Sequence, residues 1–194
     1  MIKRLEILGN IASGKTTLCK NMDKKGYLSI FENFQDNPFF KNFYKNPQAF
    51  SFETELTFLL QHYHSIKIPN KKNLIACDYS LFLDMAYADV NLSGNRHKLF
   101  TEIVEEILIE IGHPLQIIHL TCPEEVLLQR IAARNRDVER SISIDYLKSL
   151  SKAISLRLKK IPDQIQVISI NSNSINFVSG IEGLQEFEPI IKAL

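Results

Sequence analysis

An eight-residue motif near the start of the chain constrains the fold and the chemistry more than any other feature. Residues 9–16 read Gly-Asn-Ile-Ala-Ser-Gly-Lys-Thr, which matches the pattern G-x-x-x-x-G-K-[ST]. An apolar run, Ile2 to Leu8, precedes the motif, and a helical pattern resumes at Thr17. A chance match in a glycine-containing turn is the alternative, but the position between a predicted strand and a predicted helix favours a nucleoside triphosphate site.

The residue types in this motif define their roles. Glycines let the backbone fold so that successive N–H groups face one phosphate, and the following helix adds the positive end of its dipole. Lys15 supplies charge to the β- and γ-phosphate oxygens, and Thr16 offers a hydroxyl to Mg²⁺. The predicted phosphate-binding residues are Gly9, Asn10, Ile11, Ala12, Ser13, Gly14, Lys15, Thr16 and Thr17.

Beyond the motif, short apolar runs alternate with segments of helical periodicity. In Leu99 to Ile111 the apolar positions recur every three or four residues between glutamates, and Gly112 and Pro114 follow, as they do at a helix end. Strands buried on both faces of a parallel sheet read as nearly continuous apolar runs. The pattern therefore predicts an α/β fold with a five-stranded parallel sheet flanked by helices. The predicted strands are Ile2 to Leu8, Tyr27 to Phe31, Leu74 to Cys77, Gln116 to Thr121 and Ile165 to Ile170.

Length, charge and cysteine content exclude several classes of protein. The 194 residues include 23 Lys+Arg and 22 Asp+Glu, a balance that argues against a strongly basic nucleic-acid binder. No apolar run approaches the roughly 20 residues that span a bilayer, and no leader segment is expected before the first strand. With no repeat and no linker, residues 1–194 are expected to form a single domain. The three cysteines form no CxxC pair, so we expect free thiols in a cytoplasmic protein.

A carboxylate directly follows the third predicted strand, in the segment Asn73-Leu-Ile-Ala-Cys-Asp78. Ligands of open α/β sheets bind beyond the carboxyl ends of the strands, and an Asp there can hold Mg²⁺ through water. An Asp that only caps the next turn is the alternative. We favour the role beside the metal, with Thr16 as the other protein ligand.

Three arginines fall within seven residues: Arg130, Arg134 and Arg136. The first two share one face of a predicted helix, and the third lies near its end. Planar guanidinium groups stabilise the charge that develops on a transferring phosphoryl group. A solvated basic face with partners such as Glu125 or Glu139 is the alternative. Because the chain also carries a phosphate loop, we interpret the segment as a lid.

Taken in order along the chain, these motifs resemble the deoxyribonucleoside kinase family, whose members phosphorylate the 5′-hydroxyl of deoxynucleosides with ATP. Glu32 follows the second predicted strand, like the family's general base. Asp36-Asn-Pro-Phe and Phe43-Tyr44-x-x-Pro47 resemble the family's segment N-P-x-x-x-F-Y. Arg130 to Arg136, followed by Glu139, resembles its R-x-x-x-R-x-R-x-x-E lid. The likeness is to a bacterial deoxyadenosine/deoxyguanosine kinase-like branch.

This resemblance implies a P-loop kinase fold that uses ATP and Mg²⁺ and forms a homodimer through long helices such as Phe50 to Ile66. It implies that residues 171–177 wrap the ATP adenine. Glu32 and Asp84 each also have an interpretation without a functional role. Glu32 can be a surface carboxylate at a strand end, and Asp84 can be a solvent-facing residue near the start of a helix. The implied catalytic residues are Lys15, Glu32, Arg134 and Arg136. The implied ATP contacts beyond the phosphate loop are Arg130 and Arg134, and the substrate contacts are Glu32, Tyr44, Glu55, Asp78, Asp84 and Glu139.

The sequence departs from the family pattern at three positions. The third strand is followed by Asp78-Tyr79-Ser80 where the family usually has Asp/Glu-Arg-Ser, and His62 stands where the family has an Arg. Glu55 replaces the base-reading Gln. An ionised carboxylate only accepts hydrogen bonds, so it matches the two adjacent donors of guanine, and it matches adenine only when protonated or bridged by water. We therefore expect a purine, with guanine ahead of adenine, unless Glu55 pairs with a nearby cation instead.

The other histidines and aromatic residues carry less information. His62 and His64 are predicted to face different sides of a helix, so a two-histidine metal site is not expected. The dense aromatic cluster between residues 31 and 58 is expected to be mostly core, with a few members able to sandwich a planar base.

These features predict an enzyme that transfers phosphate from ATP to a deoxynucleoside in nucleoside salvage, with small molecules as its partners. A nucleoside monophosphate kinase is the neighbouring alternative, but it needs a cationic site for the acceptor's phosphate. A nucleotide-binding module with little catalysis is the alternative from another class, and Tyr79 is the residue that favours it.

Overall fold

The computed structural model describes residues 3–68 and 74–180, in which five parallel strands form one sheet in the order β2-β3-β1-β4-β5. The strands are β1 (Lys3–Gly9), β2 (Leu28–Ile30), β3 (Leu74–Cys77), β4 (Gln116–Thr121) and β5 (Gln166–Asn171). The predicted α/β fold with a five-stranded parallel sheet is therefore confirmed. Strand ends differ from the predictions by at most one residue among those described; Ile2 lies outside them.

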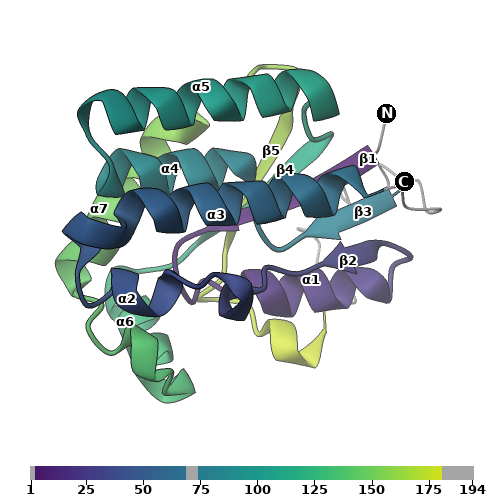
Figure 1. The fold of residues 1–194 in the computed structure, drawn as a ribbon. Coiled ribbons are helices and arrows are strands. Elements are labelled where there is room, and N and C mark those ends of the chain that lie inside the picture. The colour runs from purple at the N-terminus through teal and green to yellow at the C-terminus, as the bar shows by residue number, and fades with distance from the viewer. Residues whose placement is uncertain (1–2, 69–73, 181–194) are drawn as a thin grey trace.

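Helices flank this sheet on both faces (Figure 1). Helix α1 packs against β1, β2 and β3, whereas α4 contacts β1 and lies beside α3, α5 and α7. The α-helices are α1 (Lys15–Asp23), α2 (Phe40–Phe43), α3 (Pro47–Lys67), α4 (Leu81–Asn91), α5 (Gly94–Ile111), α6 (Glu124–Arg134) and α7 (Ile144–Leu158). Short 3₁₀ turns are η1 (Phe34–Asp36), η2 (Asp137–Glu139) and η3 (Phe177–Ser179).

Alternation along the strands builds a core on each face of the sheet. Ile117 packs with α4, α5 and α7, and its neighbour Ile118 packs with the residues of α1. Both side chains are fully buried, as expected for a parallel sheet with both faces covered. The fold is thus held by two apolar layers, one above and one below the strands.

Strand β1 also carries a buried ion pair. The Nε of Arg4 donates to Oε1 of Glu6 over 2.7 Å, and both side chains are fully buried. The guanidinium also donates to the carbonyl of Gly112, and the second oxygen of Glu6 accepts from the hydroxyl of Ser80. Since each charge is paired and hydrogen-bonded, the strand accommodates two charged residues in the core.

The helix boundaries follow from residues that cap them. Asn46 accepts a hydrogen bond from the backbone of Ala49, and Pro47 opens α3 at a position where its missing N–H costs nothing. Gly112 ends α5 with φ of 77°, which confirms the predicted helix end. Among the helices of the described ranges, none is long and apolar enough to cross a membrane.

Parallel strands bring their carboxyl ends to one edge, and this edge positions the site. Ile30 and Cys77 are paired at the ends of β2 and β3, and the backbone of Asp78 donates to the carbonyl of Ile30. The loop after β1, the segment after β2 and Asp78 therefore meet above the same edge of the sheet.

Candidate active site

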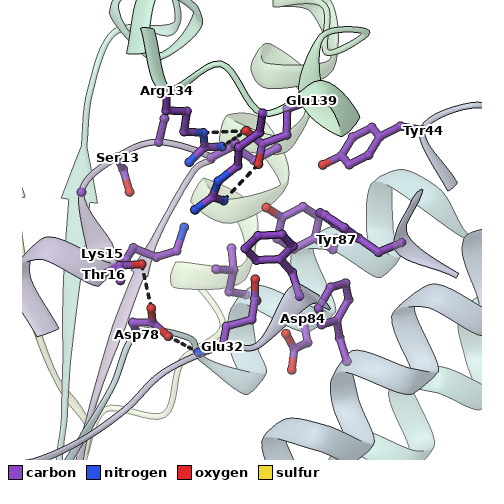
Figure 2. A pocket seen from close by; sticks show the side chains of 18 of the residues that line it. Ser13, Lys15, Thr16, Glu32, Tyr44, Asp78, Asp84, Tyr87, Arg134 and Glu139 are labelled. Atoms are coloured by element: carbon purple, nitrogen blue, oxygen red, sulfur yellow. Dashed lines mark hydrogen bonds and ion pairs between the residues drawn. The ribbon is translucent and has the colours of Figure 1, made fainter. Parts of the chain in front are cut away.

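A cavity of about 450 Å³ opens at the carboxyl edge of the sheet. It is lined by the loop between β1 and α1, by the segment after β2, by α3 and α4, and by the arginine-bearing segment that ends α6. Figure 2 shows Arg134 and Glu139 across this cavity from Asp78 and Glu32. The sequence-predicted residues from five separate parts of the chain thus meet in one space.

The phosphate loop requires glycine at its first position. A Cβ atom on Gly9 would lie 2.6 Å from the Ser13 hydroxyl and 2.8 Å from the backbone oxygen of Leu120. Gly14 adopts φ of 103° at the start of α1, a conformation that L-residues rarely adopt. Residues 11–17 line the cavity, whereas Gly9 and Asn10 lie behind it; the side chain of Asn10 donates to the carbonyl of Leu147 in α7.

Two polar groups in this loop lack the partner that a phosphate would provide. The ammonium of Lys15 donates to the carbonyls of Gly9 at 2.9 Å and of Asn10 at 3.1 Å, and burial lowers its pKa although Glu32 and Asp78 act in the opposite direction. The Ser13 hydroxyl is buried and has no hydrogen-bond partner among the described residues. An anion in the loop would satisfy both groups.

One carboxylate joins the phosphate loop to the segment after β2. Thr16 donates its hydroxyl to Oδ2 of Asp78 over 2.7 Å, and the backbone N–H of Glu32 donates to Oδ1 over 2.6 Å (Figure 2). Burial raises the pKa of Asp78, and the hydrogen bonds from Thr16 and Glu32 oppose this shift. Asp78 is thus more than a turn cap, because it fixes both a loop hydroxyl and a neighbouring carboxylate residue.

Glu32 and Lys15 share this cavity. The Glu32 side chain is 39% exposed because it faces the open space. Burial of its carboxyl group would raise the pKa, but His62, Lys15 and Arg136 outweigh that effect and lower it. The group is therefore an ionised carboxylate at neutral pH, which is the form that accepts a proton.

Aromatic rings and two further carboxyl groups line the other end of the cavity. The Tyr44 hydroxyl points into it, and burial raises its pKa (Figure 2). Glu55 is 5% exposed, and its Oε1 accepts from Asn91 over 2.7 Å. Burial raises the pKa of Glu55 to about 8, so at neutral pH it is mostly a neutral acid. The premise of an ionised Glu55, from which guanine was ranked first, does not hold at pH 7.

The expected aromatic core is only partly present. Of the cluster between residues 31 and 58, Phe43 is the phenylalanine that is buried, whereas Phe31 is 40% exposed. Phe34, Phe40 and Phe58 line the cavity with Phe43. The prediction that most of the cluster packs in the core is wrong, because these rings form the wall of a cavity instead.

The three arginines make two different sets of contacts. Arg130 donates to the carbonyls of Ser172 at 2.9 Å and of Ala12 at 3.4 Å, and so connects the phosphate loop to the segment after β5. Arg134 and Arg136 both contact the buried carboxylate of Glu139, with Nε of Arg134 at 2.5 Å from Oε2. All three line the cavity.

Helix α6 ends between the second and third arginines. Asn135 adopts φ of 48° in the left-handed region and terminates the helix after Arg134. Arg136 therefore lies outside the helix, where its guanidinium stands 4.5 Å from the ring of Phe34. Glu139 is the partner of two arginines, as the alternative interpretation expected, but the pairs face the cavity and not solvent.

Comparison with known proteins decides between the kinds of phosphate-loop protein. A family model described as deoxynucleoside kinase matches residues 5–188. The chain belongs to the deoxynucleoside kinase family.

Individual relatives agree with this assignment. Deoxyguanosine kinase of Bacillus subtilis (strain 168) is 26% identical over 199 residues, which cover 98% of this chain and 96% of the relative. Deoxyadenosine kinase of Dictyostelium discoideum is 30% identical over 179 residues, or 86% of this chain and 71% of the relative. The structure of deoxyadenosine kinase from M. mycoides with bound dCTP is similar in fold, with a TM-score of 0.81, 20% identity, and coverage of 98% and 97% of the two chains.

Of the three departures from the family pattern, Tyr79 and His62 pack on each other. Tyr79 is 1% exposed and lies under the ring of His62, with ring centroids 3.9 Å apart and planes 7° from parallel. His62 itself is 3% exposed and contacts Glu32 and Asp84. As expected, His62 and exposed His64 face different sides of α3. The described residues contain no cluster of three or more metal-ligating side chains.

Sequence reasoning gave no role to three residues of this site, of which only His62 was named, as a departure from the family pattern. Tyr87 lines the cavity from α4, three residues after Asp84, and helical spacing from Asp84 is a signal that finds it (Figure 2). Asn91 holds Glu55, and His62 joins two of the predicted carboxylates. No sequence signal predicts the contacts of these two residues, because their partners lie on other elements.

The segment after β5 lies beside the phosphate loop. Phe177 comes within 3.2 Å of the position that a Cβ on Gly14 would take, and its carbonyl accepts from Asn21 of α1 over 2.7 Å. Residues 171–177 thus stand next to the predicted ATP site, and their contact with adenine stays a prediction.

Proposed function

We propose that this enzyme transfers the γ-phosphoryl group of ATP to the 5′-hydroxyl of a purine deoxyribonucleoside, as one domain that serves nucleoside salvage. This proposal rests on one observation: Lys15 and the ionised Glu32 line the same cavity. Phosphoryl transfer needs a cation at the phosphate and a base at the attacking hydroxyl, and these two residues supply them.

The acceptor end of the cavity suits an uncharged nucleoside better than a monophosphate. Its walls carry Glu55, Asp84 and aromatic rings, and the described lysine and arginine side chains that line the cavity belong to the phosphate loop and to the arginine segment. A monophosphate would bring its negative charge toward carboxyl groups without a cation to pair it. This favours a nucleoside kinase over a nucleoside monophosphate kinase.

In the proposed reaction Glu32 accepts the proton of the 5′-hydroxyl as that oxygen attacks the γ-phosphorus. Lys15 and the loop N–H groups hold the β- and γ-phosphate oxygens, and Arg130, Arg134 and Arg136 form a lid over the transferring group. Tyr44 and Glu139 bind the sugar hydroxyl. The Glu139 carboxylate and the transferring phosphate compete for the same donors, Arg134 and Arg136. Some hydrogen bonds from these arginines therefore move from Glu139 to the phosphate when it binds.

We also propose that Mg²⁺ binds beside Thr16 and, through water, Asp78. Mg²⁺ prefers few protein oxygens together with water and substrate phosphates, and one hydroxyl with one carboxylate fits that preference. When bound, the ion neutralises charge on the phosphates. The protein's part is to hold the two oxygens 2.7 Å apart at the mouth of the loop.

A second copy of the chain is proposed to cover the outer faces of α3 and α5. A groove there is lined by Leu60, Tyr63, Ile103, Ile107 and Ile109, and Leu60 and Ile109 are 51% and 76% exposed. Apolar surface of this kind is typical of an interface. A measurement of the molecular mass of the protein in solution tests the predicted homodimer.

The three cysteines are free thiols, which supports the expected cytoplasmic location.

The decisive experiment incubates the enzyme with ATP, Mg²⁺ and each of four deoxynucleosides or their monophosphates, and identifies products by mass. We expect nucleoside monophosphates and ADP, with purines preferred. Glu32→Gln is expected to lose about 10²–10⁴-fold in kcat with nucleoside binding largely kept. Tight ATP binding without ADP formation from any acceptor would instead show a binding module, and diphosphate products would show a monophosphate kinase.

A further inference from the structure

The family pattern places an arginine after the third strand, near the transferred phosphate, and here Tyr79 occupies that position. Its side chain is 1% exposed, and its hydroxyl donates to the backbone carbonyl of His62 over 3.4 Å. A neutral, buried phenol cannot supply the positive charge of a guanidinium. A positive charge placed beside Glu32 in the manner of that arginine therefore has to come from another residue.

His62 is the basic side chain that packs on Tyr79. The two rings are stacked with centroids 3.9 Å apart, and Phe58 stacks on His62 at 6.0 Å. Nδ1 of His62 lies 2.9 Å from Oδ2 of Asp84, a hydrogen bond between two buried side chains. Two rings and one carboxylate thus fix the orientation of the imidazole.

The other ring nitrogen is directed at the proposed general base. Nε2 of His62 lies 3.5 Å from Oε2 of Glu32, within ion-pair distance but without hydrogen-bond geometry. This nitrogen is buried and has no hydrogen-bond partner among the described residues. A small movement of the exposed Glu32 side chain would form a hydrogen bond between Nε2 of His62 and the Glu32 carboxylate.

The charge of this ring follows from the groups that face it. Burial alone would lower the pKa of His62, but Asp84 from α4 and Glu32 from the segment after β2 raise it to about 10. Glu55 is a further carboxyl group on α3 that interacts with His62 and is mostly neutral at pH 7. In the other direction, His62 is the largest influence that lowers the pKa of Glu32 against its burial. The ring is an imidazolium at neutral pH.

We propose that His62 is a positioning residue which, as a cation held by Asp84 and stacked on Tyr79, orients the Glu32 carboxylate in place of the arginine of the family pattern. This inference rests on the proposed role of Glu32 as general base. No bond forms or breaks at His62. The proton of the 5′-hydroxyl moves to Glu32, and His62 holds the Glu32 carboxylate in the orientation that receives it.

The first test compares kcat and the KM values for ATP and nucleoside in the wild-type enzyme, His62→Gln and His64→Gln, the last being an exposed histidine two residues along the same helix. Without the imidazole the Glu32 carboxylate is no longer oriented, so the kcat of His62→Gln falls at least tenfold while both KM values stay at wild-type values. The His64→Gln variant keeps wild-type kcat and KM. A wild-type kcat in His62→Gln, or a loss of kcat accompanied by an equal loss of ATP binding, would overturn the proposal, because the second result would indicate a merely structural role.

The second test does not depend on activity or on the folding of a His62 variant. Ring ¹⁵N chemical shifts report the protonation of His62 in the wild-type enzyme and in Glu32→Gln. We expect an imidazolium at pH 7–8 in the wild type and a lower pKa in Glu32→Gln, since one of two flanking carboxylates is gone. A neutral ring at pH 7, or an unchanged pKa in the variant, overturns the role of His62. Full turnover by Glu32→Gln would refute the proposed general base instead.

Discussion

The buried carboxyl group of Glu55 predicts a base preference that changes with pH. This residue lies on α3, is 5% exposed, and accepts one hydrogen bond from Asn91, which also donates to the Tyr146 hydroxyl over 3.1 Å. Burial is the largest cause of its raised pKa of about 8; the Asn91 hydrogen bond lowers the pKa, Asp84 and Glu32 raise it, and His62 lowers it. Glu55 therefore titrates in the range where enzymes are assayed.

The two forms of this group match different bases. A neutral carboxylic acid has one donor and one acceptor, like Gln, so it can donate to N1 of adenine and accept from the 6-amino group. The same form can donate to O6 of guanine and accept from N1–H, whereas the ionised form accepts from N1–H and the 2-amino group. Adenine thus requires the proton on Glu55, and guanine does not.

The size of the effect follows from the titration. With a pKa of about 8, Glu55 is about 90% protonated at pH 7 and about 10% protonated at pH 9. The ratio of kcat/KM for deoxyadenosine to that for deoxyguanosine should therefore fall about tenfold between these pH values. The adenine contact is present below the pKa and is lost as the pH rises through it. Groups that titrate away from the base contact affect both substrates and cancel in the ratio.

The assay places both nucleosides in one reaction with ATP and Mg²⁺ and measures the two monophosphates by mass, because their ratio reports the ratio of kcat/KM. Glu55→Gln is the matched variant, since the amide keeps one donor and one acceptor at every pH. Its ratio should stay constant from pH 7 to 9. A constant ratio in the wild-type enzyme, or an equal fall in Glu55→Gln, would refute the reasoning.

Two further predictions test the phosphate loop and the arginine segment. Gly9→Ala should weaken ATP binding at least tenfold and lower the free energy of unfolding by about 1–3 kcal/mol, because its methyl group would meet the Leu120 backbone oxygen at 2.8 Å; calorimetric ATP titration and thermal unfolding measure this. Gly26→Ala, with nothing within 4 Å, should leave ATP binding unchanged. Glu139→Gln should cost about 1–3 kcal/mol in urea unfolding, because Arg134 and Arg136 lose their buried carboxylate. An unchanged urea midpoint would mean that water solvates the two arginines as favourably as the Glu139 carboxylate does.

Periodicity and short motifs predicted the fold because they are local signals. The strand before the phosphate loop, the loop itself and α5 each depend on residues close in sequence, so β3 and β4 match their predicted ranges. Asp78 and the arginines were predicted from local motifs and Glu32 from the resemblance, and all of them line one cavity. Glu32 and Asp78 follow strand ends, which a parallel sheet places at one edge, and Arg130 and Arg134 lie one helix turn apart on α6.

The protonation and pairing of the site residues could not be predicted in the same way. Glu55 was treated as ionised because the sequence shows neither its burial nor its contact with Asn91, 36 residues away. His62 acquires its role through Tyr79 and Asp84, which lie 17 and 22 residues further along the chain. Effects of this kind depend on which side chains meet after folding, and a single sequence does not contain that information.

The carboxylate of Asp78 has a consequence for how the two substrates bind. One of its oxygens contacts the helix that follows the ATP loop, and the other contacts the backbone of the residue proposed to activate the nucleoside. Occupation of either subsite therefore acts on a contact that the other subsite shares. The affinities for ATP and nucleoside are expected to be thermodynamically linked, with each ligand changing the affinity of the other by the same factor.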